Sequence, residues 1–133
     1  MAAVLTTAGM AGVASRIIWD SSGHEAPFTY IAVGTGTTAA TDADTALETE
    51  IAAGGLSRAA GTLSRVTTTE TDDTAVCEKE FTVTLAGPYA VTEAGQLNAA
   101  STGTLLWHDV FSAYNLVLDD VFTVTAETVV EAG

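Results

Sequence analysis

The sequence predicts a mainly β, single-domain protein: an antiparallel β-sandwich or barrel with an N-terminal helix and a second short helix near residues 41–53. Three observations support this prediction. Residues 74–86 alternate apolar and polar side chains with the period of a half-buried strand. After residue 55, segments rich in Thr and Val follow one another through short turns, with no helical pattern between them. The 133 residues, 47% of them apolar, suffice for one core, so residues 1–133 are expected to form one domain with a β-rich body over about 28–130.

The first expected element is a helix over about residues 7–19. Thr6 or Thr7 can cap its N-terminus, because a threonine hydroxyl accepts a hydrogen bond from the first free backbone N–H groups. Gly9 and Gly12 weaken the helix by up to about 1 kcal/mol each relative to Ala, so we expect it to depend on packing for its stability. Its apolar residues follow helical spacing and form one stripe: Met10, Val13, Ala14, Ile17 and Ile18.

The segment "TDADTALETEI", residues 41–51, predicts the second short helix. Thr41 and Asp44 form a pair like a capping box, and the acids of the first turn suit the positive end of a helix dipole. An apolar face follows at helical spacing: Ala43, Ala46, Leu47 and Ile51. The run "AAGG" at residues 52–55 is expected to end this helix.

The strands are expected before and after that helix. Residues 28–33 read as one strand, and later segments as several more: 56–70, 74–86, 89–99, 104–114 and 116–130, the last two joined near Asn115. In 74–86 the apolar face comprises Cys77, Phe81, Val83 and Leu85, with Lys79 the one misfit. In the final strand the shared face comprises Leu116, Leu118, Phe122, Val124 and Ala126.

A glycine motif follows the first of these strands. Gly34, Gly36 and Ala39 match the dinucleotide-binding pattern G-x-G-x-x-A after a strand. That site needs a helix to begin inside the motif, whereas the next helix signal begins only at residue 41 and brings carboxylates that repel phosphate. We therefore expect no bound nucleotide, and expect the two glycines to let the backbone turn through positive φ.

The charge of the chain limits its partners. Seventeen acidic residues stand against four basic ones, for a net charge of −13, so binding to nucleic acid or to an anionic membrane is not expected. No window of 18 apolar residues suggests a membrane span either. A calcium-binding surface, docking to a basic partner or adaptation to high salt could each explain the charge. The scattered acids and single Lys favour high salt, where the Debye length shrinks to about 3 Å.

No residue is expected to act as a catalytic, cofactor-binding or metal-binding group. His24 and His108 have no neighbouring His or Cys at a spacing typical of zinc ligands, and His108 is expected to face solvent or a subunit interface. Cys77 reads as a small buried apolar residue. Calcium bound by acidic clusters remains an alternative, because four pairs of carboxylates lie close in sequence: Asp42/Asp44, Glu48/Glu50, Asp72/Asp73 and Asp119/Asp120. The sequence shows no catalytic triad, and an enzyme is not expected.

Much of the chain resembles a group of small virion proteins of tailed viruses. The resemblance lies in "TTAGMAGVASRII" followed by "PFTYIAVGTGTTAATDADTALETEI", and in "VTEAGQLNAASTGTLLWHDVF" followed by "LDDVFTVTAETV". Arg58 or Arg65 matches the basic position that follows the first motif. The chain departs from the pattern at Gln96, where Leu is more usual, and at His108, where a basic residue is common.

This resemblance implies a non-enzymatic structural protein of the virion, assembled in the host cytoplasm. A capsid decoration or turret protein of a tailed virus with a halophilic host is the favoured role. The alternative is a tail, baseplate or tail-fibre component that binds the host surface. The implied partners are the major capsid protein or tail proteins, together with further copies of the chain in a homo-oligomer.

Overall fold

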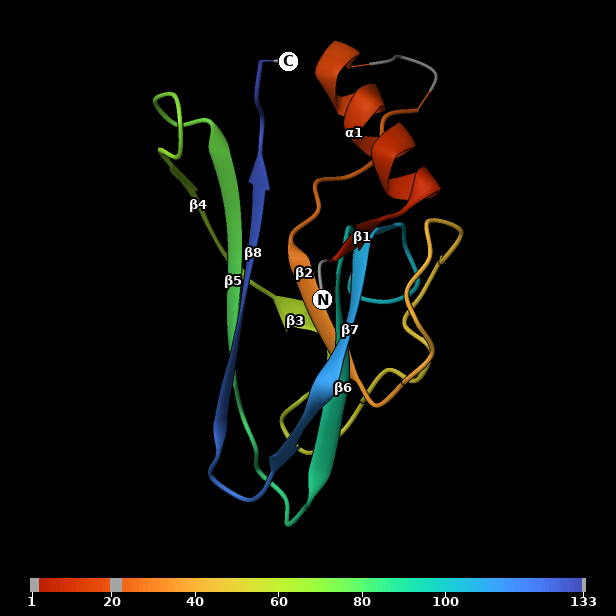
Figure 1. Cartoon of the computed structure of the whole chain (residues 1–133), viewed down its shortest axis with the longest axis vertical. Helices are drawn as coiled ribbons and strands as arrows, with labels where there is room; N and C mark the ends of the chain where they lie inside the picture. Colours follow the sequence, from red (N-terminus) through yellow and green to blue (C-terminus); the bar gives the residue numbers. More distant parts are fainter. Residues whose placement is uncertain (1–2, 20–22, 133) are drawn as a thin grey trace.

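The structure, a computed structural model, describes residues 3–19 and 23–132. It is mainly β with antiparallel sheets, as the sequence predicts, and has two sheets and one helix among these residues (Figure 1). The elements in chain order are β1 (Val4–Leu5), α1 (Thr7–Ile18), β2 (Tyr30–Gly34), β3 (Ala59–Ala60), β4 (Thr62–Val66), β5 (Thr74–Thr82), β6 (Tyr89–Leu97), β7 (Leu105–Leu116) and β8 (Val121–Val129).

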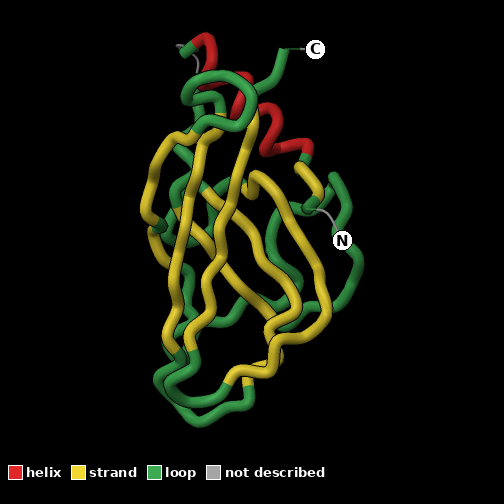
Figure 2. Tube along the Cα trace, turned by 60° about the vertical axis from the view of Figure 1, so that its left-hand side comes forward, coloured by secondary structure: helices red, strands yellow, loops and turns green. Residues whose placement is uncertain are grey.

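The two sheets form two layers. The larger has the strand order β1-β7-β6-β2-β3 and the smaller has the order β4-β5-β8. Figure 2 shows α1 at one end of the strand layers. The long connection from β2 to β3 lies on the side of the larger sheet that faces away from the smaller sheet (Figure 1).

The main core lies between the sheets and confirms most of the predicted alternation. Cys77, Phe81 and Val83 are buried there. Leu85 is exposed instead, because β5 ends at Thr82 and the chain has begun its turn into β6. Burial raises the pKa of the Cys77 thiol.

The last hairpin lies later than the sequence suggests. Leu116 is still part of β7 and is buried, whereas Leu118 is half exposed in the turn before β8. Asp120 closes this turn, since its carboxylate accepts a hydrogen bond from the Val117 N–H at 2.8 Å. The predicted junction at Asn115 was therefore wrong by a few residues, because the signal for the turn is its aspartates.

Helix α1 forms where predicted but packs through unexpected residues. The Thr6 hydroxyl caps it by accepting a hydrogen bond from the Gly9 N–H at 2.9 Å. A Cβ on Gly9 would lie 2.6 Å from the Leu106 backbone, and one on Gly12 would lie 2.8 Å from the Phe28 ring. The glycines are therefore the contact face, and the predicted stripe is largely exposed. Among the described residues, no helix has the length and apolar character needed to cross a membrane.

The second helix predicted near residues 41–53 does not form. The Thr41–Asp44 pair exists, with the Thr41 N–H donating to the Asp44 carboxylate at 2.9 Å. A helix would continue by bonding the next N–H groups to carbonyls four residues back. Instead the Glu48 and Thr49 N–H groups donate to the Glu93 carboxylate, at 3.0 and 2.7 Å, so a long-range side chain replaces the helical bonds.

Candidate functional site

The outer face of the larger sheet carries a buried carboxylate that holds the long loop after β2. Glu93 of β6 is completely buried. Besides the Glu48 and Thr49 N–H groups, it accepts a hydrogen bond from the Gly36 N–H at 3.2 Å. One side chain thus satisfies backbone donors from the start and from the middle of the loop.

The same carboxylate explains the glycine motif. A Cβ on Gly34 would lie 2.5 Å from the Thr49 carbonyl oxygen and would collide with the Glu93 carboxylate. A Cβ on Gly36 would lie 2.8 Å from the Glu93 Cδ. Neither glycine has positive φ, so that expectation was wrong. These positions require glycine because the backbone lies directly against a buried carboxylate.

His108 completes the cluster from the neighbouring strand, β7. Its Nε2 lies 2.8 Å from Glu93 Oε2, and its Nδ1 lies 2.7 Å from Asp44 Oδ2. The ring is buried, so the expectation that it faces solvent or a subunit interface was wrong. Burial alone would lower the pKa of His108, but the hydrogen bonds to Asp44 and Glu93 outweigh burial and raise it. Burial likewise opposes ionisation of Asp44, yet its bonds with His108 and Thr41 leave its pKa lowered.

The cluster of Asp44, Glu93 and His108 is suited to a structural role, in which it holds the loop after β2 against the larger sheet. With both ring nitrogens facing carboxylates, His108 is best satisfied as a doubly protonated imidazolium. Both oxygens of Glu93 and both of Asp44 already accept hydrogen bonds from within the chain. A second fastening lies nearby, where Arg58 binds Glu50 with Nη2–Oε1 at 2.6 Å. The Glu93 and His108 contacts hold the loop against the sheet, and the Arg58–Glu50 pair joins two residues within the loop.

The acidic pairs considered for calcium serve turns and loop contacts. The Asp73 carboxylate accepts hydrogen bonds from the Glu70, Thr68 and Thr69 N–H groups, and these hold its pKa well below the usual range. Glu48 accepts one from the Thr37 N–H at 3.3 Å. Among the described residues no group of three His, Cys, Asp or Glu side chains is placed to share a metal ion.

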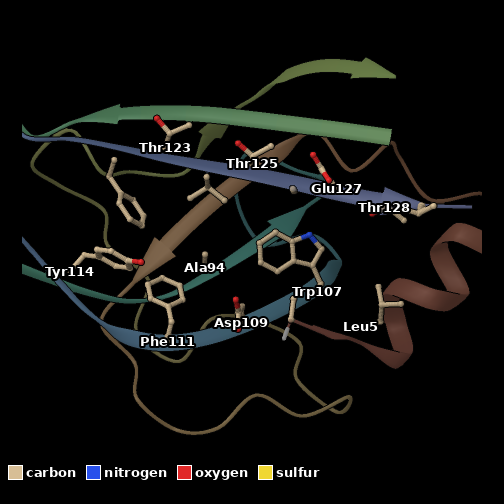
Figure 3. A pocket seen from close by; sticks show the side chains of 15 residues that line it. Leu5, Ala94, Trp107, Asp109, Phe111, Tyr114, Thr123, Thr125, Glu127 and Thr128 are labelled. Carbon is tan, nitrogen blue, oxygen red and sulfur yellow. The ribbon is translucent and has the colours of Figure 1, made fainter. Parts of the chain in front are cut away.

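The inner face of β7, which is directed towards the smaller sheet, borders an open cleft between β7 and β8 (Figure 3). Its volume is about 770 Å³. Trp107, Asp109 and Phe111 point from β7 towards β8 in this view. Gln96 of the neighbouring strand β6 orients Trp107, because the Trp107 Nε1–H donates to Gln96 Oε1 at 2.7 Å. The cleft is therefore lined by aromatic rings and by two carboxylates, Asp109 on β7 and Glu127 on β8.

Three of these rings form an aromatic trio at one end of the cleft. Phe111, Tyr114 and Phe122 have ring centroids 5.4–6.5 Å apart. Phe111 and Tyr114 can reach the same cleft because β7 carries extra residues opposite β6, where the register shifts between Val91 and Glu93. This irregularity left no pattern in the sequence, which is why the cleft could not be predicted.

Asp109 is the unusual member of the cleft. Its Oδ1 is buried and has no hydrogen-bond partner among the described residues. A buried carboxylate oxygen is costly to leave without a donor. His24, the other candidate of the sequence, lies elsewhere, with its ring stacked on Trp19 at 3.7 Å.

Comparisons with protein-family models, with curated proteins and with solved structures find no match.

Proposed function

We propose that this chain is a non-enzymatic structural protein of a tailed-virus particle, with capsid decoration or a turret as its role. The observation that carries the proposal is the outer face of α1. Ile17, Ile18 and Trp19 are 78%, 73% and 60% exposed at the end of the helix, and Met10 and Val13 continue the stripe. Exposed apolar surface of this kind is typical of a contact with another protein.

The charge distribution supports the same role for α1. Residues 3–19 contain no Asp or Glu, although the chain has 17 acids. Elsewhere the surface repels an acidic neighbour, whereas this face does not. An apolar, acid-free helix face therefore suits attachment to a capsid protein, and the resemblance of the sequence to small virion proteins supports a viral shell as the partner.

The contacts that hold the loop between β2 and β3 also fit a structural role. The acid–histidine cluster and the Arg58–Glu50 pair hold the connection between β2 and β3 in one conformation. Decoration proteins stabilise a shell by binding its assembled state, so a pre-ordered surface lowers the entropy lost on attachment. The acidic remainder of the surface fits a halophilic host, for which we expect a lower melting temperature in dilute buffer than in molar salt.

Binding to shells tests the proposal. Purified protein is mixed with viral shells that lack it, and the pellet is analysed after sedimentation. We expect saturable capture that is lost in Ile17→Ser/Ile18→Ser and kept in the control Thr67→Ser, an exposed position in the β4–β5 turn. Capture by purified tails would instead support the tail or baseplate role, and capture by neither would contradict a virion role through α1.

A further inference from the structure

The two sheets leave free strand edges around the cleft. β8 pairs only with β5 among the described strands, so its other edge has unused backbone N–H and C=O groups. The outer edge of β7 is paired with β1 only at Trp107 and His108. Free edges beside an apolar cleft are the setting in which proteins accept an additional strand from another chain.

The contents of the cleft indicate the chemistry of that strand. The aromatic rings favour apolar side chains, and the unpartnered Asp109 oxygen requires a hydrogen-bond donor. An arginine satisfies a carboxylate best, because its guanidinium donates two parallel hydrogen bonds and carries the opposite charge. The expected occupant is therefore an extended segment with an apolar residue and an arginine on the same face.

Strand β4 of the same chain meets this description. All five of its residues are exposed, and it is the edge of the smaller sheet opposite to β8. Leu63 and Arg65 lie opposite Cys77 and Ala75 of β5, so they share the face that Cys77 turns towards the core. Leu63 is 56% exposed, and Arg65 forms no ion pair among the described residues.

The other basic side chains are less suited to this contact. Arg58 is held by Glu50, and Arg16 lies over the Trp19 ring at 4.8 Å. Lys79 is on β5, a strand paired on both sides. Charge complementarity therefore selects Arg65 as the donor for Asp109.

We propose that copies of this chain associate head to tail, with β4 of one copy added to the free edge of β8 of the next. The added strand extends the smaller sheet over the cleft, and its Leu63 and Arg65 face Phe111 and Asp109 of the receiving copy. Because β4 and β8 are opposite edges of one sheet, the contact is heterologous and repeats into a ring or a filament. The net charge of −13 opposes association, so higher salt should promote it.

The test is the oligomeric state by light scattering and native mass spectrometry, in molar salt and over a range of concentration. We expect the wild type to form oligomers, and expect Arg65→Glu and Asp109→Arg each to raise the dissociation constant about 30-fold or more. The double variant Arg65→Glu/Asp109→Arg restores the pair with its charges exchanged and should associate again. Arg16→Glu, which makes the same charge change on α1, should associate like the wild type.

Circular dichroism of each variant separates lost association from lost folding. Amide exchange should show that the β8 N–H groups facing away from β5 are protected only in the oligomer. A wild type that stays monomeric at every concentration and salt overturns the proposal. So does an oligomer that both single variants leave intact, or a cleft that takes a strand only from another virion protein. The inference is independent of the proposed location, since the chain can associate in this way without binding shells through α1.

Discussion

The two faces of β7 differ in whether their ionisable side chains have hydrogen-bond partners. His108 points to the outer face, where Asp44 and Glu93 hold both of its ring nitrogens. Asp109, the next residue, points to the inner face, where one buried oxygen has no partner among the described residues. The outer face is complete within one chain, whereas we propose that Arg65 of a second copy completes the inner face. Hydrogen-bonding partners within the chain thus distinguish residues that maintain the fold from residues that we propose contact a second copy.

The largest effect is expected on the complete face. Glu93→Gln replaces one carboxylate oxygen by an NH₂ group, which in either orientation faces at least one backbone N–H: those of Gly36 and Thr49, or that of Glu48 beside His108. Removing one partner of a buried charge pair costs about 3–5 kcal/mol, and we expect this loss in the free energy of unfolding by denaturant titration. Glu127→Gln, on an exposed position of β8, is the control and should change little. A loss below about 1 kcal/mol would contradict a holding role for Glu93.

The glycine motif gives the next effect on the same face. Gly34→Ala places a methyl group 2.5 Å from the Thr49 carbonyl oxygen and against the Glu93 carboxylate. Overpacking of this kind costs about 1–3 kcal/mol, measurable as a lower denaturation midpoint. Ala46→Ser, exposed in the same loop, is the matched control. An unchanged midpoint for Gly34→Ala would show that the loop does not lie against Glu93.

The titration of His108 should give a smaller effect with a defined sign. The folded state raises the pKa of His108 above its ordinary 6.5, so its stabilising contribution is complete below pH 6.5 and is lost as pH rises through the folded value. We expect the melting temperature to fall as pH rises above 6.5, and expect His108→Gln to remove this pH dependence. His24→Gln should keep it, because that ring lies outside the cluster. A slope that survives in His108→Gln would contradict the assignment.

The smallest effect on the free energy of unfolding is expected on the inner face of β7, from Asp109→Asn, the acid-to-amide change equivalent to Glu93→Gln. Asp109→Asn removes a buried charge that has no donor among the described residues, so the isolated chain should lose no stability and should gain up to about 1 kcal/mol. Thermal unfolding of the monomer at low concentration measures it. A loss comparable with that of Glu93→Gln would show that both faces are complete within one chain.

Local periodicity predicted most of the fold. The alternation around Cys77 and Phe81 placed β5 and its core face, and Thr6 was among the residues expected to cap α1. The packing of α1 could not be read from its apolar stripe, because the deciding contact is the close approach of Gly9 to the Leu106 backbone. A glycine at a helix contact looks like a weak helix former until its neighbour is known.

The site depended on contacts between residues far apart in the chain. Glu93 competes with helix formation in residues 41–53 by binding the N–H groups of Glu48 and Thr49, some 45 positions earlier. Two signals existed: polar residues within apolar strands, at Glu93 and His108, and a glycine motif without a phosphate-binding helix. Neither signal alone identifies its partner, so the cluster became visible only in three dimensions.

The copy number of this chain in purified virus particles tests the virion role most directly. Quantitative mass spectrometry would measure it against the major capsid protein. A decoration protein should be present in hundreds of copies per particle and a turret protein in tens, whereas a handful would move the chain to the tail tip or a fibre. Absence from purified particles would contradict the virion role altogether.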